Sequence, residues 1–429
     1  MTALPARLPL PLSSDGPLSE KARLDGRWAD LERLRSSHPM MDAVIEEVDG
    51  RRIRVGEQWL FDFASCNYLG FDLHPRIIEA VAPALRKWGT HPSWSRLLGN
   101  PRPYVEIEER LTEMLGAPDS LVLPTISIIH TSVIPLLAGQ GAVLVDAQAH
   151  KTIYDGAAIA KGAGATLHRI RANDPEHLEQ VLRAFPARVM KVFCIDGVNS
   201  MTGNTPDLGH YARLCRDYGA LLYVDDAHGF GVIGEHPSPE EPWGRRGNSI
   251  VRFYDESYQN IVLVAGFSKS YSSLAAFLAL PSALKNYLKV AAPPYLYSGP
   301  SPVASLATVL AGFEVNEAEG DAIRASLRHK ARAVLDQIAR LGLRTLNTSG
   351  FPVIELPLGH ADDIDAVGRF LFERGIYVTL APYPLVPRAQ VGFRIQVTAA
   401  NDDEQVEHLN DVLAELAERF EMQRSAQVA

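Results

Sequence analysis

The chain has 429 residues, of which 46% are hydrophobic and 22% are charged, and its formal net charge is −9. This composition is typical of a soluble globular enzyme, and the length predicts two domains rather than one core. Because no basic patch or basic run accompanies the negative charge, the sequence gives no indication of nucleic-acid or anionic-membrane binding.

The termini and the cysteines predict a cytoplasmic protein. The N-terminus is proline-rich, its apolar stretch is too short for a signal peptide, and no apolar run approaches the length of a membrane span. Cys66, Cys194 and Cys215 lie among apolar neighbours without the spacing of metal ligands, which is typical of reduced cysteines in a core. A cytoplasmic location is therefore the default expectation.

Residues 1–60 are predicted to form an N-terminal extension. Its first part, 1–16, is proline-rich and should be extended. Residues 18–36 are charged, with Leu and Trp recurring among the charges, which predicts an amphipathic helix.

Residues 61–302 are predicted to form the larger domain. Short apolar runs, expected to be buried strands, alternate here with helical patterns such as 104–115, 175–184 and 209–218. This alternation predicts an α/β domain with a mostly parallel sheet flanked by helices. The segment 235–248 is rich in proline, glycine and charge, and we expect an exposed loop there.

Residues 303–429 are predicted to form a smaller α+β domain. A long helical pattern covers 303–341. Three strand-like runs follow at 351–356, 377–380 and 393–397, and two helical patterns at 361–374 and 402–419.

Three polar clusters each follow an apolar run of the larger domain. Asp225, Asp226 and His228 come after one run, Ser268 and Lys269 after a second, and Asp146 with His150 after a third. In open α/β sheets, ligands bind outside the carboxyl ends of the strands, which is where these residues should lie.

One lysine, a carboxylate and two imidazoles are the groups that pyridoxal 5'-phosphate (PLP) requires. The aldehyde of PLP forms a Schiff base with a lysine, for which Lys269 is the candidate, and its ring nitrogen pairs with a carboxylate. Only one of the adjacent residues Asp225 and Asp226 can face the ligand. No cysteine or third histidine lies at ligand spacing from His150 and His228, so we expect no metal site.

The combined motifs resemble the α-oxoamine synthases, which are fold-type I PLP-dependent transferases. These motifs are Asn67-Tyr68-Leu69-Gly70, Ser95-Arg96, Asp146 with His150, Ser200-Met201, Asp225 to Gly229 and Ser268-Lys269-Ser270. The resemblance covers about residues 60–415 and implies a homodimer with active sites at the subunit interface. It also implies that Asp225, rather than Asp226, pairs with the ring nitrogen.

Further roles are implied by the resemblance alone. His150 would stack on the cofactor ring, and His228, supported by Ser200, would bond the phenolic oxygen. Asn67 and Arg96 would contact the substrate. Ser298 lies in a segment that relatives contribute to the phosphate site of the partner subunit.

The phosphate site departs from the pattern of these relatives, which place Ser-Gly-aromatic after the corresponding strand. This chain has Thr125, Ile126 and Ser127 there, whose hydroxyls and helix N-terminus could hold a phosphate. Gly266 replaces a threonine three residues before the lysine, and Ser268 could compensate for the lost hydroxyl.

The substrate side departs as well. Gly392 replaces the first arginine of an Arg-x-Arg pair, which leaves Arg394 as the candidate clamp for a substrate carboxylate, although an arginine at a strand edge is nearly as common. Tyr104 replaces a histidine, and Ser272-Ser273 replaces glycine-rich sequence.

The resemblance implies an enzyme that forms an amino-acid α-carbanion, with Lys269 as general base, and condenses it with an acyl thioester with loss of carbon dioxide. The departures leave three alternatives open. These are an enzyme that uses S-adenosylmethionine or another unusual amino acid with a non-thioester electrophile, an aminotransferase, and a catalytically silent scaffold.

Overall fold

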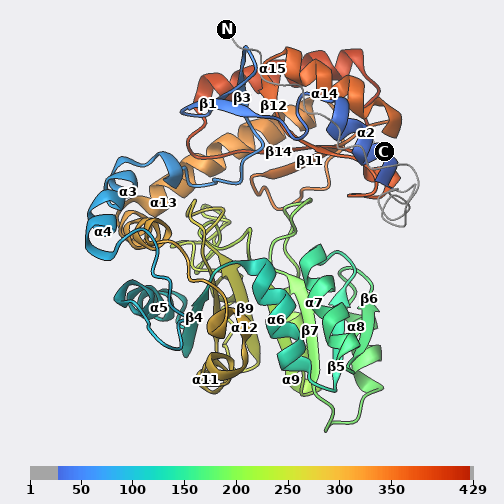
Figure 1. Cartoon of the computed structure of the whole chain (residues 1–429). Helices are drawn as coiled ribbons and strands as arrows, with labels where there is room; N and C mark the ends of the chain where they lie inside the picture. The colour runs from blue at the N-terminus through green and yellow to red at the C-terminus, as the bar shows by residue number, and fades with distance from the viewer. Residues whose placement is uncertain (1–27, 426–429) are drawn as a thin grey trace, which may run out of the picture.

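The computed structural model describes residues 28–425, which form two lobes (Figure 1). The lower lobe contains a seven-stranded sheet, and the upper lobe contains two smaller sheets. The predicted extended segment 1–16 and the first part of the predicted helix 18–36 lie outside the described residues. The remainder of that helix is α2 (Ala29–Ser37).

The large sheet has the strand order β4-β10-β9-β8-β7-β5-β6. Its strands are β4 (Asp119–Leu123), β5 (Ala142–Asp146), β6 (Thr166–Ile170), β7 (Lys191–Asp196), β8 (Leu221–Asp225), β9 (Ile261–Gly266) and β10 (Ala276–Leu280). Strands β9, β8, β7, β5 and β6 pair in parallel, whereas β10 runs antiparallel to both β4 and β9. The prediction of a mostly parallel sheet is confirmed.

Helices cover the two faces of this sheet, so every residue of β5, β7 and β9 is buried. Such double burial explains why these strands appear in the sequence as continuous apolar runs. The helices are α5 (Arg102–Leu115), α6 (Ile126–Ala138), α7 (Lys151–Gly162), α8 (Pro175–Arg183), α9 (Leu208–Asp217), α10 (Ile250–Phe253), α11 (Ser282–Ala291) and α12 (Pro293–Leu296). The predicted helices 104–115, 175–184 and 209–218 correspond to α5, α8 and α9.

The predicted loop 235–248 contains no helix or strand, and its single regular feature is an isolated bridge between Glu235 and Arg245. The expectation that it is exposed holds for Pro242, Arg245 and Arg246 but is wrong for Trp243, Gly247 and Asn248. Trp243 and Asn248 are buried there, and the Asn248 amide donates to Met114 O. The side chain of Asn248 therefore ties the loop to α5.

Parallel strands bring the polar clusters of the sequence to one edge of the sheet. Asp196, the last residue of β7, pairs in register with Asp225, the last residue of β8. Strand β5 ends at Asp146, and β9 ends at Gly266, three residues before Lys269. This edge faces the upper lobe.

The upper lobe has a four-stranded sheet of order β1-β2-β3-β12 and a three-stranded sheet of order β11-β14-β13. Their strands are β1 (Ile45–Asp49), β2 (Arg52–Val55), β3 (Gln58–Asp62), β11 (Val353–Pro357), β12 (Ile376–Tyr377), β13 (Thr379–Ala381) and β14 (Gly392–Gln396). The predicted strands at 351–356 and 393–397 are β11 and β14. The run at 377–380 is divided between β12 and β13, which belong to different sheets.

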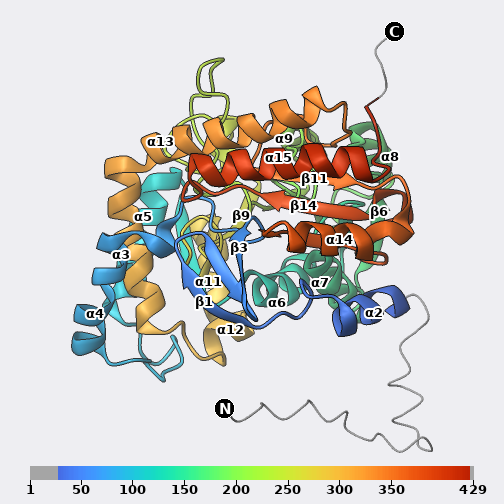
Figure 2. The same ribbon diagram turned by 90° about the horizontal axis from the view of Figure 1, so that it is seen from above.

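The long helix α13 (Val303–Arg340) connects the lobes and packs beside α15 (Asp403–Arg419), as Figure 2 shows from above. The remaining helices are α3 (Pro75–Glu79), α4 (Val81–Trp88) and α14 (Ile364–Glu373). The predicted helices 303–341 and 402–419 correspond closely to α13 and α15. The predicted helix 361–374 begins as a short 3-10 turn and continues as α14.

Candidate active site

A cavity of about 190 Å³ lies at the carboxyl ends of β7, β8 and β9. It is lined by Thr125, Ile126, Ser127, His150, Thr152, Asp196, Val198, Ser200, Asp225, Ala227, His228, Ser268 and Lys269. The structure thus brings together every residue that the sequence predicted to be catalytic, and every predicted cofactor residue except Ser298. Asn67, Arg96 and Arg394 do not line this cavity.

The amine of Lys269 carries no hydrogen bond and no ion pair within residues 28–425. Burial lowers the pKa of Lys269, and the negative charge of Asp225 only partly opposes this shift. A lower pKa increases the fraction of neutral amine, which is the form that reacts with an aldehyde and accepts a proton.

Asp225 and Asp226 point in different directions, as expected for neighbours at the end of a strand. Asp225 lines the cavity, whereas Asp226 is completely buried and its Oδ2 accepts a hydrogen bond from Ile250 N at 3.0 Å. Burial would raise the pKa of Asp225, but the neighbouring His130, which also donates a hydrogen bond, and the charge of Lys269 hold it below the ordinary value. For Asp226, burial dominates and raises the pKa well above the ordinary value.

His228 is fixed in the cavity wall by Tyr68, whose hydroxyl lies 2.7 Å from His228 Nδ1. Burial raises the pKa of Tyr68 well above the ordinary value and lowers the pKa of His228 well below it. The tyrosine therefore keeps its proton and donates it to Nδ1, which leaves Nε2 of the neutral imidazole as an N–H donor.

Helix α6 begins at the other end of the cavity. The Thr125 hydroxyl caps the helix by accepting a hydrogen bond from Ile128 N at 3.3 Å. A helix N-terminus presents free N–H groups and favours an anion. A Cβ at Gly266 would lie 2.7 Å from Cδ1 of Ile126, so the isoleucine fills the space that a larger residue at 266 would need.

His150 is held through both its backbone and its ring. Its backbone N donates to Asp196 Oδ1 at 2.9 Å, and its Nδ1 lies 2.8 Å from the hydroxyl of Thr152. Burial lowers the pKa of His150, which favours a neutral ring facing the cavity. Burial, and then the charge of Asp225, raise the pKa of Asp196 well above the ordinary value.

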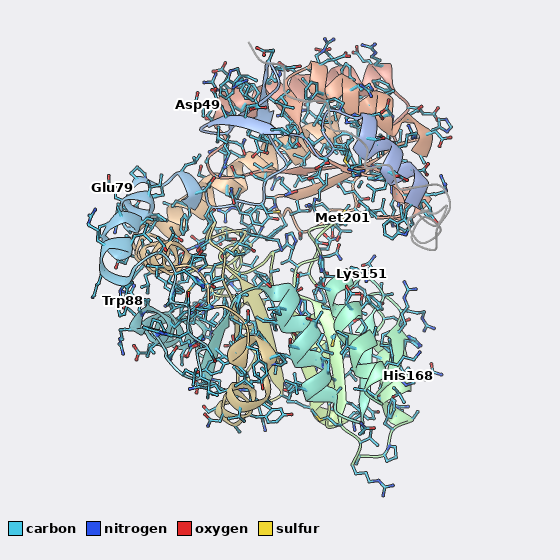
Figure 3. The ribbon with its side chains drawn as sticks, in the orientation of Figure 1. Asp49, Glu79, Trp88, Lys151, His168 and Met201 are labelled. Atoms are coloured by element: carbon cyan, nitrogen blue, oxygen red, sulfur yellow. The ribbon has the colours of Figure 1, made fainter. Side chains whose placement is uncertain are left out.

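Arg394, on β14, approaches the cavity from the upper lobe. Its Nη1 donates to Ser200 O at 2.5 Å and lies 3.8 Å from Met201 Sδ. Figure 3 shows Met201 at the junction of the two lobes. Arg394 therefore holds the backbone of a residue that lines the cavity, although its own side chain is not part of the lining.

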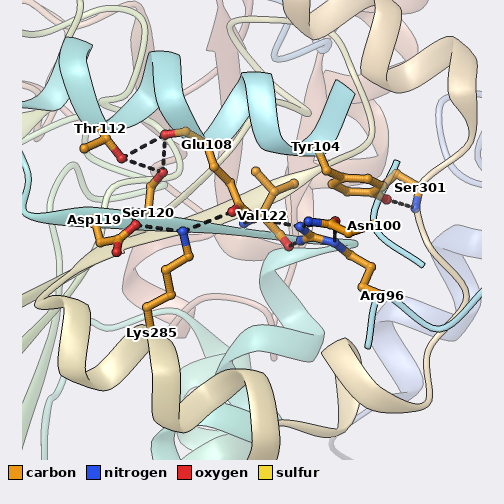
Figure 4. Close-up of polar contacts among 10 residues, drawn as sticks. All are labelled: Arg96, Asn100, Tyr104, Glu108, Thr112, Asp119, Ser120, Val122, Lys285 and Ser301. Carbon is orange, nitrogen blue, oxygen red and sulfur yellow. Dashed lines mark hydrogen bonds and ion pairs between the residues drawn. The ribbon is translucent and has the colours of Figure 1, made fainter. Parts of the chain in front are cut away.

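Arg96 lies in a buried polar cluster outside the cavity (Figure 4). Its Nη2 lies 2.9 Å from Glu108 Oε1, and its Nη1 donates to Val122 O at 2.5 Å. The guanidinium also lies over the ring of Tyr104, at 4.1 Å from the ring centroid. These contacts engage Arg96 within its own chain, and the contact with substrate stays a prediction.

Asn67 and Ser298 also lie outside the cavity. The Asn67 amide donates to Asp72 Oδ2 at 3.0 Å, and Asp72 forms an ion pair with the buried Arg51. Ser298 follows α12, and its hydroxyl donates to Gly299 O. A contribution of Ser298 to the partner's site stays a prediction.

Four polar residues of the site region were missed by the sequence reasoning. Thr152 and Asp196 line the cavity, and Tyr68 and His130 bind cavity residues. Asp196 had a visible signal, because it follows an apolar run just as Asp225 does. His130 is a lone polar ring in an apolar helix, and nothing local distinguishes it from an ordinary core histidine.

The residues present fit PLP. A partly buried lysine without a hydrogen-bond partner in residues 28–425, an ionised carboxylate, a neutral histidine donor and a helix N-terminus meet around one cavity. They match, in turn, the aldehyde, the ring nitrogen, the phenolic oxygen and the phosphate.

Two other findings concern metal ions and membranes. Within residues 28–425 no group of histidine, cysteine and acidic side chains is placed to hold a metal ion. None of the helices in the same range has both the length and the hydrophobicity needed to cross a bilayer.

Comparison with known proteins gives consistent matches over nearly the whole chain. The family described as aminotransferase class I and II matches residues 59–413. An 8-amino-7-oxononanoate synthase of Pseudomonas putida is 32% identical over 404 residues, which cover 93% of this chain and 97% of that protein. The enzyme of the same name from Methylobacillus flagellatus is 30% identical and covers 96% and 98%.

Solved structures support the same relationship. The serine palmitoyltransferase of Sphingomonas wittichii superimposes with a TM-score of 0.82 at 25% identity, covering 96% of this chain and 98% of that one. A serine palmitoyltransferase structure described with PLP has a TM-score of 0.84 at 25% identity, with coverage of 94% and 99%.

Proposed function

We propose that this chain, which belongs to the aminotransferase class I and II family and within it to the PLP-dependent α-oxoamine synthases, condenses an amino acid with an acyl thioester. The observation that carries the proposal is one cavity with Lys269 and Asp225, in a chain 32% identical to an 8-amino-7-oxononanoate synthase over 404 residues. The predicted fold-type I transferase fold and the predicted cofactor are confirmed by these relatives.

PLP, when bound, supplies an electron sink for the pair of electrons released at the α-carbon of an amino acid. We assign four tasks to the residues of this chain. Asp225 holds the ring nitrogen in its protonated form, His228 donates Nε2–H to the phenolic oxygen, and His150 packs against the ring. The hydroxyls of Ser127 and Ser268 and the N-terminus of α6 bind the phosphate, with Thr125 as helix cap.

Lys269 would have two tasks, because its amine would hold the aldehyde of the cofactor and, in its neutral form, could accept the α-proton of the amino acid. Its lowered pKa supports this role at neutral pH. Arg394 is the candidate for the substrate carboxylate, since its guanidinium donates to the backbone of Ser200, a residue that lines the cavity. For Arg96 and Asn67, the contacts support positioning roles rather than direct binding of substrate.

The assembly proposed is a homodimer. Two neighbouring segments, 90–99 and 297–303, are joined by a hydrogen bond from Val303 N to Thr90 O. They expose a group of large apolar side chains, namely Trp94, Leu97, Leu98 and Tyr297, the last two at 84% and 83% exposure. A patch of this kind supports an interface with a second copy, and it would bring Ser298 close to the partner's site.

The division into an extension (1–60), a cofactor-binding domain (61–302) and a small domain (303–429) also stays a proposal. The seven-stranded sheet and all cavity-lining residues fall within 61–302, which supports it. Strand β3, however, pairs with β12 across the predicted boundary at residue 60, so the extension and the small domain share a sheet. The cytoplasmic location stays a prediction from the sequence.

The test is an assay of the PLP-loaded enzyme with small amino acids and a panel of acyl thioesters. Equal amounts of free thiol and carbon dioxide should appear with one amino acid and one thioester. Lys269→Ala should give neither product, while Arg102→Ala, a change at an exposed ion pair with Glu109, should match the wild type.

Two outcomes would contradict the condensation reading. If no thioester releases thiol, while S-adenosylmethionine alone is consumed, the enzyme uses a non-thioester electrophile instead of the proposed acyl thioester. If an amino donor converts the cofactor to its pyridoxamine form and a keto acid restores it, the enzyme is an aminotransferase.

A further inference from the structure

His130 is a fully buried histidine for which the proposed chemistry has no task so far. It lies on α6, one turn after the residues at the phosphate end of the cavity. The buried residues around it on this helix, such as Ile129, Val133 and Ile134, are apolar. A polar ring in such surroundings is costly unless both nitrogens have partners. Both nitrogens of His130 do.

The first partner is Tyr223 on β8, whose hydroxyl lies 2.8 Å from His130 Nδ1. Tyr223 is completely buried, and burial raises its pKa well above the ordinary value, so the phenol keeps its proton. Within residues 28–425, the only hydrogen-bond partner of the Tyr223 hydroxyl is His130 Nδ1. Tyr223 therefore donates, and Nδ1 must be the nitrogen without a hydrogen.

The second partner is Asp225, whose Oδ2 lies 2.9 Å from His130 Nε2. Because Tyr223 leaves the hydrogen of the neutral ring on Nε2, this contact is an N–H donated to the carboxylate. The other oxygen, Oδ1, accepts a hydrogen bond from Ala227 N at 3.0 Å. The two donors reach different oxygens of Asp225 and together fix the plane of its carboxylate.

A charged His130 would disturb this arrangement in two ways. A hydrogen on Nδ1 would leave the buried Tyr223 hydroxyl without its acceptor, a loss of about 1–3 kcal/mol in general. A positive ring would also neutralise the charge of Asp225 that faces the cavity. A neutral His130 would keep both contacts and would leave the negative charge of Asp225 to pair with a single positive charge on a ligand.

We propose that Tyr223 and His130 are positioning residues for Asp225, which hold its carboxylate ionised and aimed at the ring nitrogen of PLP. Tyr223 selects the tautomer of His130, and His130 supplies the hydrogen bond that orients Asp225. The inference deepens the proposed function and rests on its assignment of the ring nitrogen to Asp225. Tyr223 and Asp225 can act on one histidine because they are two residues apart on β8 and therefore lie on the same side of the strand.

The test compares two ligands of the full-length apoprotein, PLP and an analogue in which a C–H group replaces the ring nitrogen. Both ligands share every other contact, so the ratio of their dissociation constants isolates the interaction of Asp225 with the nitrogen. A general distortion of the cavity weakens both ligands alike and leaves the ratio unchanged. The ratio is measured by fluorescence titration for the wild type and for each variant.

We expect the wild type to prefer PLP over the analogue and Asp225→Asn to lose this preference. Tyr223→Phe and His130→Ala should reduce the preference about tenfold, the size of one hydrogen bond to a charged group. His130→Gln should restore most of it, because the glutamine amide can donate from nearly the same place. Tyr211→Phe, on α9 and outside the cavity, removes a buried hydroxyl that has no hydrogen-bond partner in the described part of the chain, and it should leave the ratio unchanged.

The results separate the two levels of the proposal. If Asp225→Asn loses the preference while Tyr223→Phe and His130→Ala keep it, the positioning role is wrong and the proposed function stands. If the wild type shows no preference, or Asp225→Asn retains it, the assignment of Asp225 is wrong and both proposals fall. Should His130→Ala not fold, Tyr223→Phe decides whether the positioning role is right, since it removes one hydroxyl and leaves the ring in the core.

Discussion

At the scale of single residues, Asp225 and Asp226 show that two adjacent residues can place their carboxyls in different surroundings. Asp225 has charged and hydrogen-bonding neighbours that keep its pKa below the ordinary value. Asp226 has Ile250 N as donor to one oxygen, while its other oxygen is buried and has no hydrogen-bond partner among residues 28–425. The first is suited to pair with a cation in the cavity, and the second to remain protonated in the core.

Substituting each of these residues by asparagine should separate their roles. Asp225→Asn removes the charge at the cavity, and we expect kcat/KM to fall on the order of a hundredfold or more, as for the loss of a preorganised electrostatic contact. Asp226→Asn keeps the acceptor for Ile250 N and should retain wild-type kcat/KM. Steady-state kinetics of the two variants, with their PLP content measured, provides the check. An inactive Asp226→Asn beside an active Asp225→Asn would reverse the assignment.

Glu355 is a third unusual carboxyl, located on β11 directly opposite Arg394 of β14. It is 1% exposed, and neither of its oxygens has a hydrogen-bond partner in the described part of the chain. Burial raises its pKa from 4.5 to about 7, against the opposing charges of Arg344 and Arg394. The folded protein therefore keeps Glu355 protonated over a pH range in which the unfolded chain has lost that proton.

Stability should depend on pH through Glu355. Because the folded-state pKa is the higher one, the free energy of unfolding falls as pH rises from 4.5 to about 7, by about 3 kcal/mol in total. In Glu355→Gln this contribution is absent. The difference in unfolding free energy between variant and wild type, from urea titrations, should grow by that amount between pH 4 and pH 8. A difference that is constant over this range would show that Glu355 ionises normally.

The roles of polar residues could be predicted from the sequence where they follow strands. Lys269, Asp225, His228 and His150 were found because each follows an apolar run, and parallel strands bring such positions together. His130 lies inside a helix, and its partner Asp225 is 95 residues away. Such a contact depends on how α6 packs against the sheet, which local patterns do not contain.

At the scale of elements, the cluster around Arg96 joins four segments of the lower lobe. Arg96 precedes α5, Glu108 lies on α5, Val122 lies on β4, and Lys285 of α11 forms an ion pair with Glu108 at 3.1 Å. On the other side of Arg96, the hydroxyl of Tyr104 accepts a hydrogen bond from Ser301 N at 2.5 Å. The cluster thus anchors both segments of the proposed dimer patch from beneath.

Arg96→Ala should therefore affect stability before it affects substrate binding. Removing one partner of a buried ion pair leaves Glu108 partly uncompensated, and we expect a loss of about 3 kcal/mol in unfolding free energy. The KM for the amino acid should stay close to that of the wild type when the variant is measured well below its melting temperature. A large rise in KM without loss of stability would restore the predicted contact with substrate.

Strands with two covered faces were predictable, and strands with one open face were not. Each core strand of the large sheet is a continuous apolar run in the sequence. Strand β1 is exposed at every residue, and β3 pairs with β12, which lies more than 300 residues further along the chain. The predicted strand 377–380 is divided because neighbouring residues pair with different sheets, a choice made by tertiary contacts.

At the scale of the whole molecule, the exposed apolar patch predicts a dimer in solution. Light scattering during gel filtration should give twice the mass of one chain. Leu98→Asp combined with Tyr297→Asp places two charges in the patch and should shift the protein towards the monomer, because charges in the centre of an interface are costly. Val48→Asp, at an exposed position on β1, is the matched control and should leave the mass unchanged. A wild type that is monomeric at micromolar concentration would contradict the proposed interface.

The measurement that tests the central claim most directly is the identity of the residue that carries PLP. Reduction of the PLP-loaded protein with borohydride should fix the cofactor covalently, and peptide mass spectrometry should find it on Lys269, the lysine that lines the cavity beside Asp225. The adduct should be absent in Lys269→Ala. An adduct on a different lysine of the wild-type protein would contradict the account of the site.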